Sequence, residues 1–331
     1  MSAKYSRIIS TGSALPAARI TNEDLARRLA ADGIETSDEW IRTRTGIEAR
    51  RFVNGTTETT TTLAAAAAQK ALEGGGVDPK TIDLIIVATT TPDQVFPSTA
   101  AAVQRLIGAV GCAAFDVQAV CAGFIYALNA ADAMLRAGSY QRALVIGAET
   151  MSRVIDMKDR ATCVLFGDGA GAVVLEASAK PGILAARMYA DGSYDENVLG
   201  LTARIDHGEL CGRPYINMDG RQVFKLAVDG LTSSAQEVAV LAGVDPQDVD
   251  VYIPHQANLR IMTMVAKKLG IPDERMIKTV SEQGNTSAAS VPLALDEAVR
   301  SGKISDGSLV LLQAVGAGMA WGSAIVRWRS E

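Results

Sequence analysis

Apolar residues recur along the chain in two alternating patterns. Stretches of about 15 residues with the 3.6-residue spacing of amphipathic helices occur at 59–72, 122–137, 219–241, 258–269 and 287–299. Short, uninterrupted apolar runs lie between them at 84–88, 113–117, 143–147, 251–253 and 309–312. Because these runs do not alternate with polar residues, they predict strands covered on both faces. The alternation of helices and strands predicts an α/β fold.

The chain also repeats itself at an offset of 167 residues. GVDPKTIDLIIV begins at Gly76 and GVDPQDVDVYIP begins at Gly243, and YALNAADAMLRAG aligns with PLALDEAVRSG at the same offset. We infer two duplicated α/β halves, 1–178 and 179–331. The Ala- and Leu-rich helices at 122–137 and 287–299 are expected to lie in the interior. Two buried helices between two covered sheets would give a five-layer α-β-α-β-α sandwich.

Composition and charge narrow the class of protein. The 331 residues are 48% hydrophobic and 21% charged, which is typical of a well-cored globular protein. A net charge of -5 disfavours a general nucleic-acid binder. The four cysteines show neither paired nor metal-ligand spacing, which predicts no disulfide framework and no metal site. This usage favours a cytoplasmic protein.

Two segments bear on membranes and export. MSAKYSRIISTGS at the N-terminus lacks a long apolar region before a cleavage site, so no export signal is expected. Residues 309–326 carry no charge, but Gln313, Gly316, Gly318 and Gly322 interrupt them. We interpret this run as two buried strands joined by a glycine turn, and we expect no membrane partner.

Cys121 is the first candidate for chemistry. In QAVCAGF it follows a predicted strand and stands at the start of a predicted helix. The N-terminus of a helix favours a thiolate, and small neighbours leave room for an acyl group. The simpler alternative is that Cys121 acts as a small buried hydrophobe.

Two polar residues could assist this cysteine. His255 follows the strand VYIP, at the edge where α/β sheets tend to bind ligands, whereas His207 lies in the loop-like RIDHGEL. Asn285, in EQGNTSAAS, aligns with Gln118 at the 167-residue offset, three residues before Cys121. Alternatively, His255 could have a purely structural role, and Asn285 could simply cap the N-terminus of a helix.

Four motifs in order, AFDVQAVCAGF, FGDGAGAVV, HQANLRI and GNTSAASVPLAL, closely resemble β-ketoacyl-acyl carrier protein synthase III, a family of the thiolase superfamily. The resemblance implies a thiolase fold and a homodimer. It implies decarboxylative condensation of an acyl-CoA, acetyl-CoA first, with malonyl-acyl carrier protein. Cys121 would carry the acyl group, and His255 and Asn285 would donate hydrogen bonds to the malonyl thioester oxygen. The coenzyme A thioester would be a substrate, and no cofactor is expected.

The resemblance also implies binding residues. Backbone N–H groups of Cys121 and of Gly316, Ala317 and Gly318 would bind the oxyanion. Coenzyme A would contact Asn258, Trp40 and Arg160 would sandwich its adenine, and Arg44 would lie near its phosphates. Phe96 would lie near the end of the acyl tunnel. A basic stripe, which its spacing places on one helix face, would attract the carrier protein; its residues are Arg260, Lys267 and Lys268.

Departures from the family pattern widen the range of functions that the sequence allows. A GGGF-like stretch is replaced by Gly-Ala-Gly-Met at 316–319, and Val315 stands where an aromatic is common. Ala317 keeps its donor role only if its φ is negative. The starter could therefore be a longer or specialised acyl group. The sequence is also compatible with a Cys-His-His enzyme using His207, with a cysteine hydrolase, and with a non-catalytic acyl- or carrier-binding module.

Overall fold

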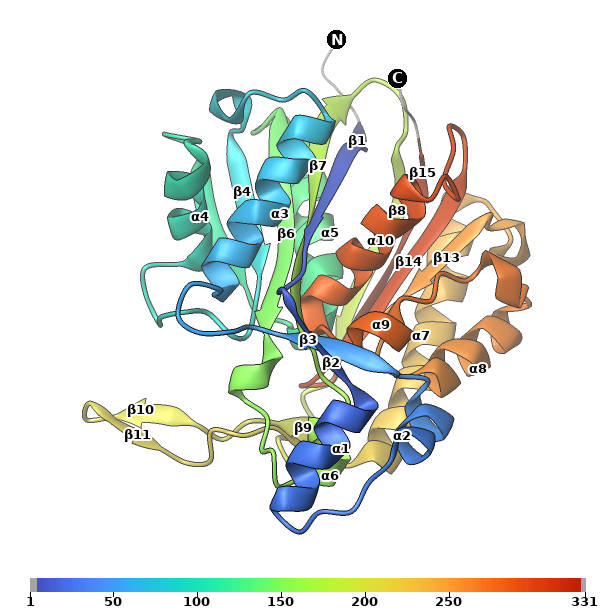
Figure 1. The fold of residues 1–331 in the computed structure, drawn as a ribbon. Coiled ribbons are helices and arrows are strands. Elements are labelled where there is room, and N and C mark those ends of the chain that lie inside the picture. Colours follow the sequence, from blue (N-terminus) through green and yellow to red (C-terminus); the bar gives the residue numbers. More distant parts are fainter. Residues whose placement is uncertain (1–4, 329–331) are drawn as a thin grey trace.

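Two β-sheets form the centre of the molecule (Figure 1). The structure is a computed structural model that describes residues 5–328. The first sheet has the order β1-β7-β6-β4-β5, with β1 (Tyr5–Ala14), β4 (Leu84–Ala88), β5 (Ala113–Val117), β6 (Arg142–Thr150) and β7 (Asp168–Ser178). The second has the order β13-β14-β15-β8, with β8 (Ile183–Ala190), β13 (Val251–Pro254), β14 (Leu309–Gly316) and β15 (Ala320–Arg327).

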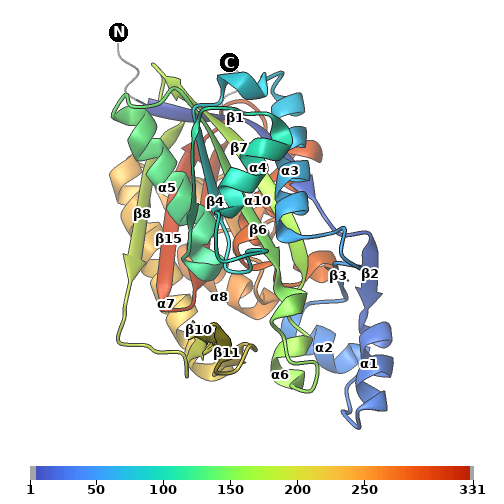
Figure 2. The same cartoon turned by 90° about the vertical axis from the view of Figure 1, so that its left-hand side faces the viewer.

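Helices cover and separate these sheets (Figure 2). The outer layer on the first sheet consists of α3 (Thr60–Gly74) and α4 (Thr99–Ile107). The layer between the sheets consists of α5 (Gly123–Arg136) and α10 (Ser290–Arg300). The outer layer on the second sheet consists of α7 (Gly220–Ala242) and α8 (Leu259–Leu269). The predicted five-layer thiolase-type sandwich is therefore confirmed.

Smaller elements connect and extend these layers. The helices among them are α1 (Asn22–Ala31), α2 (Asp38–Thr45), α6 (Arg160–Cys163) and α9 (Val280–Gln283). The strands are β2 (Ala18–Thr21), β3 (Ala49–Phe52), β9 (Leu199–Gly200), β10 (Arg204–Asp206), β11 (Glu209–Cys211) and β12 (Asn217–Met218). The 3₁₀ turns are η1 (Pro79–Thr81), η2 (Val120–Ala122), η3 (Met151–Arg153), η4 (Pro246–Asp248), η5 (Asp273–Arg275) and η6 (Ser287–Ala289).

The backbone repeats at the offset seen in the sequence. β4 and β13 begin at residues 84 and 251, and α5 and α10 begin at residues 123 and 290, so both pairs differ by 167. Val120 and Ser287, also 167 apart, have the positive φ angles 48° and 50°. The chain leaves the first sheet at Ser178 and enters the second at Ile183. The division into domains 1–178 and 179–331 stays a prediction.

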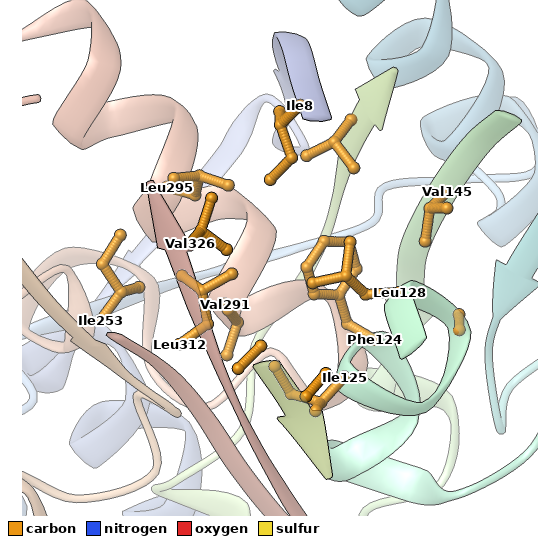
Figure 3. Packing of buried hydrophobic residues seen from close by; sticks show 14 of the residues in the cluster. Ile8, Phe124, Ile125, Leu128, Val145, Ile253, Val291, Leu295, Leu312 and Val326 are labelled. Carbon is orange, nitrogen blue, oxygen red and sulfur yellow. The ribbon is translucent and has the colours of Figure 1, made fainter. Parts of the chain in front are cut away.

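The central core lies between the two sheets (Figure 3). Phe124 and Leu128 from α5 and Val291 and Leu295 from α10 are almost wholly buried there. Burial of each such side chain contributes about 1.5–3 kcal/mol. In β4, Ile86 faces this core whereas its neighbours Ile85 and Val87 face the core under α3, as predicted for a strand covered on both faces.

One predicted strand is less buried than the others. β5 packs against α4 on one face and α5 on the other, as predicted, but each of its residues is only half-buried. The physical reason is position, since β5 is the edge strand of its sheet and pairs only with β4 within residues 5–328.

The uncharged run at 309–326 forms β14 and β15, which pair antiparallel through a turn containing Gly318. Within the described residues, no helix has both the length and the apolar content needed to cross a membrane.

Candidate active site

A cavity of about 690 Å³ opens where the two halves meet. Cys121, His255 and Asn285 all contribute to its wall, although they come from three distant parts of the chain. The remaining lining is mainly apolar, and its members include Met151, Leu165, Leu199, Leu201, Ile216, Met218, Val223 and Phe224. The structure thus brings the three predicted reactive residues to one place.

Cys121 is held by a tight backbone turn. It lies in η2 directly after Val120, whose φ of 48° is unusual for a β-branched residue. The backbone of Gly316 lies against this turn, because a Cβ at that position would stand 2.7 Å from the Cys121 nitrogen. The glycine is therefore required for the close approach of β14 to the nucleophile.

The protonation state of Cys121 differs from the expectation of a thiolate. The pKa of the thiol is raised to about 12, mainly by burial and in part by the charge of Glu149, although the Ser287 hydroxyl lowers it. Loss of hydration outweighs the favourable helix N-terminus. The resting side chain is a thiol, so it must lose a proton when it attacks.

His255 lies directly after β13 and is buried. Its Nδ1 is 3.0 Å from the Ser290 hydroxyl, and that oxygen accepts a hydrogen bond of 2.7 Å from the Gln256 N–H. This arrangement favours a hydroxyl that donates to Nδ1 and an imidazole protonated on Nε2. Burial lowers the pKa of His255 to about 3, so the ring is neutral near pH 7.

Asn285 is oriented by hydrogen bonds to its backbone and side chain. Its backbone N–H donates to the Leu165 carbonyl at 2.8 Å, and its carbonyl accepts from the Gly167 N–H at 2.9 Å. Its side-chain oxygen accepts from the Ser287 N–H at 2.9 Å. Since the oxygen is occupied in this way, the NH₂ group is the end available to donate to a ligand.

The predicted oxyanion loop borders the same cavity. Ala317 and Gly318 line it together with Val315, while Gly316 packs behind Cys121. Gly318 has a φ of 92°, but Ala317 is not among the described residues with positive φ. Ala317 therefore meets the conformational condition for an L-residue in this loop.

The three residues predicted to hold the nucleotide end of coenzyme A lie together. The guanidinium carbons of Arg44 and Arg160 are 4.6 Å and 4.5 Å from the centre of the Trp40 ring. These are cation–π contacts. Because Arg160 lies directly against the indole, an adenine between the two requires the Arg160 side chain to move.

The other predicted binding residues occupy separate places. Asn258 lines the cavity and caps α8, and its amide donates to the Arg44 carbonyl at 3.2 Å. Phe96 is 82% exposed and is not among the lining residues, so the structure does not place it in the cavity of its own chain.

The basic stripe is exposed on α8. Arg260, Lys267 and Lys268 all face solvent, as their spacing predicts. Lys268 forms an ion pair of 3.3 Å with Asp229 on α7, which leaves Arg260 and Lys267 as the better candidates for partner contacts.

The second histidine lies elsewhere. His207 is at the tip of the β10–β11 hairpin with its side chain 98% exposed. This position argues against a Cys-His-His site.

Several polar residues around Cys121 were not predicted from the sequence. Glu149, Ser287 and Ser290 are buried beside the three candidates. Ser287 and Ser290 stand within the motif GNTSAAS, and Glu149 comes two residues after the predicted strand 143–147. A carboxylate at the end of a buried strand was the signal available for Glu149.

Comparisons with known proteins find one family along most of the chain. The family described as 3-oxoacyl-[acyl-carrier-protein (ACP)] synthase III matches residues 115–192, and its C-terminal model matches residues 240–328. The 3-oxoacyl-[acyl-carrier-protein] synthase III of Aquifex aeolicus is 48% identical, with a TM-score of 0.90 over 98% of this chain and 100% of that chain. The corresponding enzyme of Thermus thermophilus is 40% identical, with a TM-score of 0.90 and the same coverage.

A condensing enzyme of a polyketide pathway is also similar. The priming β-ketosynthase of the R1128 polyketide biosynthetic pathway is 37% identical, with a TM-score of 0.92 over 98% of this chain and 97% of that chain.

Proposed function

Because this chain belongs to the 3-oxoacyl-[acyl-carrier-protein] synthase III family of condensing acyltransferases, we propose that it condenses an acyl-CoA starter with malonyl-acyl carrier protein. The products are a 3-oxoacyl carrier protein, coenzyme A and carbon dioxide, in the first condensation of fatty acid biosynthesis. One observation carries the proposal: a thiol and two neutral hydrogen-bond donors, Cys121, His255 and Asn285, border one cavity.

The first half-reaction loads the enzyme. The Cys121 sulfur attacks the thioester carbonyl of acyl-CoA and displaces coenzyme A, which leaves an acyl-cysteine. Backbone N–H groups of Cys121 and of the 316–318 loop would bind the oxyanion that forms during attack. A thiol suits this exchange because a thioester bond of comparable energy is broken and formed.

The second half-reaction makes the carbon–carbon bond. Hydrogen bonds from His255 Nε2–H and the Asn285 NH₂ group would stabilise the negative charge that develops on the malonyl thioester oxygen as carbon dioxide leaves. The enolate carbon then attacks the acyl-cysteine and expels the Cys121 sulfur. This step requires neutral hydrogen-bond donors, and His255 is one of them because its lowered pKa keeps the ring neutral. It uses no metal or other cofactor.

The direct test incubates the protein with acetyl-CoA and malonyl-acyl carrier protein and measures the carrier by intact mass. The expected result is a 3-oxobutanoyl carrier protein, formed together with carbon dioxide. Release of free acetate without condensation would instead indicate a hydrolase, and binding without any product would indicate a non-catalytic module.

We propose acetyl-CoA as the starter, and a longer acyl group is the second candidate. The apolar wall of the cavity and the similarity to a priming β-ketosynthase favour testing longer chains. In the same assay, a series of straight and branched acyl-CoAs at equal concentration ranks the starters by kcat/KM.

We propose that the partner of the exposed β5 edge is a second copy of the chain. The half-buried residues of β5 offer an unpaired strand, and beside it Val95, Phe96 and Val110 are 73%, 82% and 86% exposed. An exposed edge with large apolar side chains favours association. A homodimer would bring the segment around Phe96 to the partner's cavity. Light scattering is expected to give a molar mass of twice the chain mass of 34.7 kDa.

The carrier protein is proposed to dock on the exposed face of α8. Acyl carrier proteins are acidic, and Arg260 and Lys267 give this acidic enzyme a local positive surface.

Reversal of both charges, Arg260→Glu with Lys267→Glu, is expected to raise the KM for malonyl-acyl carrier protein about 10-fold. The KM for acyl-CoA should stay unchanged, because coenzyme A is proposed to bind at Trp40. Lys303→Glu, in an exposed turn before β14, is the matched control. Equal effects on both substrates would contradict docking at α8.

We further propose a cytoplasmic location, which the four unpaired cysteines support.

A further inference from the structure

Glu149 is a buried carboxylate beside the nucleophile, and neither proposed half-reaction uses it. It lies near the end of β6, is 0% exposed, and faces neutral groups. Its two oxygens accept hydrogen bonds from the backbone N–H groups of Thr90 and Thr91 and from the hydroxyls of Thr89, Thr90, Thr91 and Ser287. Burying a carboxylate without a cation is costly, so a position of this kind requires an explanation.

Ser287 connects this carboxylate to the thiol. Its hydroxyl donates to Glu149 Oε1 at 3.0 Å, and its turn η6 packs against η2, the turn that holds Cys121. Backbone contact between the halves fixes this geometry, because a Cβ at Gly147 in β6 would stand 2.1 Å from the Ala288 carbonyl oxygen. Ser287 itself has a φ of 50°, a sparsely populated conformation of the kind found at functional sites.

We infer that Cys121, Ser287 and Glu149 form a proton relay, in which the carboxylate of Glu149 accepts the thiol proton through the serine hydroxyl during acyl transfer. This inference rests on the proposed function, since it assigns the proton that Cys121 loses when it attacks acyl-CoA. In this relay Ser287 exchanges the proton with the reacting sulfur, and Glu149 acts through Ser287.

Protons and electron pairs balance in this step. The Ser287 proton moves to Glu149 Oε1, the Cys121 proton moves to Ser287 Oγ, and the sulfur electron pair forms the bond to the thioester carbonyl carbon. When the tetrahedral intermediate collapses, the bond between that carbon and the coenzyme A sulfur breaks. The proton returns from Glu149 through Ser287 to the departing sulfur, so coenzyme A leaves as a thiol and Glu149 is again a carboxylate.

The electrostatics of the site favour this route. Without a relay, ionisation of Cys121 would place two negative charges in a buried region, and the Glu149 charge already raises the pKa of the thiol. The relay keeps one negative charge, which passes from the carboxylate to the sulfur. Burial raises the pKa of Glu149, and this makes the carboxylate a better proton acceptor.

His255 is a poorer acceptor of the thiol proton than Glu149. Its pKa is lowered to about 3, and its Nδ1 is engaged with Ser290. Asp93, which pairs with Arg153, accepts a hydrogen bond from the Thr60 N–H, and the Thr60 hydroxyl lies 2.8 Å from that of Thr150, the residue after Glu149.

The test measures the rate of Cys121 acylation by acetyl-CoA, using rapid quenching and intact mass, between pH 6 and pH 9.5. Two variants break the relay: Glu149→Gln removes the acceptor, and Ser287→Gly removes the hydroxyl while suiting the positive φ. Each is expected to slow acylation about 100-fold at pH 7. The rate should then rise about tenfold per pH unit, because it follows the small thiolate fraction of Cys121. The wild-type rate should be nearly flat above the pKa of Glu149.

The matched control is Asp132→Asn, which neutralises another buried carboxylate that accepts from the Ser6 hydroxyl at 2.7 Å. It is expected to change stability but not the pH profile. A uniform loss of rate with a wild-type pH profile in the relay variants would show a structural role and overturn the relay. If Glu149→Gln fails to fold, the pH profile of Ser287→Gly alone decides whether the relay exists. Absence of acylation in the wild-type protein would contradict the proposed function itself, whereas wild-type profiles in both variants would contradict only the relay.

Discussion

Cys121→Ser is expected to lower the rate of acyl transfer from acetyl-CoA by about 10⁴-fold or more, without loss of the fold. A serine hydroxyl is far less acidic than a thiol and is a weaker nucleophile. The change is nearly isosteric at a buried position, so the thermal unfolding temperature should fall by only a few degrees. Intact mass after incubation with acetyl-CoA measures the effect, because the wild-type protein should gain one acetyl group.

The matched control is Cys112→Ser, since Cys112 is half-buried and is not among the residues that line the cavity. It should acylate at the wild-type rate. An undiminished mass gain in Cys121→Ser would show that another group carries the acyl chain, and would return Cys121 to the role of a buried hydrophobe.

His255→Ala and Asn285→Ala are each expected to slow decarboxylation of malonyl-acyl carrier protein by about 10²–10³-fold, the usual cost of one donor to a developing oxyanion. Both should still accept an acetyl group on Cys121, because their proposed role begins in the second half-reaction. Release of carbon dioxide from a pre-acylated enzyme measures this step separately.

Asn285→Asp separates the donor role from size, since it keeps the shape and replaces the NH₂ donor by an acceptor. It should be as slow as the alanine variant. Normal condensation by any of the three variants would remove the assigned role.

The pH dependence of decarboxylation follows from the state of His255. Its pKa in the folded protein is about 3, below the ordinary value of 6.5. The neutral ring is therefore present throughout pH 5–8, and titration of His255 should not appear in the profile over this range. For the same reason the folded state loses stability as the pH falls below about 6.5, because the unfolded chain binds a proton that the buried ring excludes.

Local patterns were sufficient to predict most elements. Helices α3, α5, α7, α8 and α10 begin and end within a few residues of the predicted ranges. The period of apolar positions is a property of neighbouring residues, so it can be recognised without the tertiary structure. β5 shows the limit, because an apolar strand in the middle of a sheet and one at its edge have the same sequence pattern.

The sequence by itself determined the alternation of helices and strands, and it placed Cys121 and His255 just after predicted strands and Asn285 just before a predicted helix. One cavity collects all three. Only the tertiary structure decided that Glu149 and Ser287, 138 positions apart, lie in hydrogen-bond contact beside the thiol. It also decided that Cys121 rests as a thiol and His255 as a neutral ring. The physical reason is that both effects arise from packing: two sheets and two central helices exclude water from these groups, and the loss of hydration sets their ionisation.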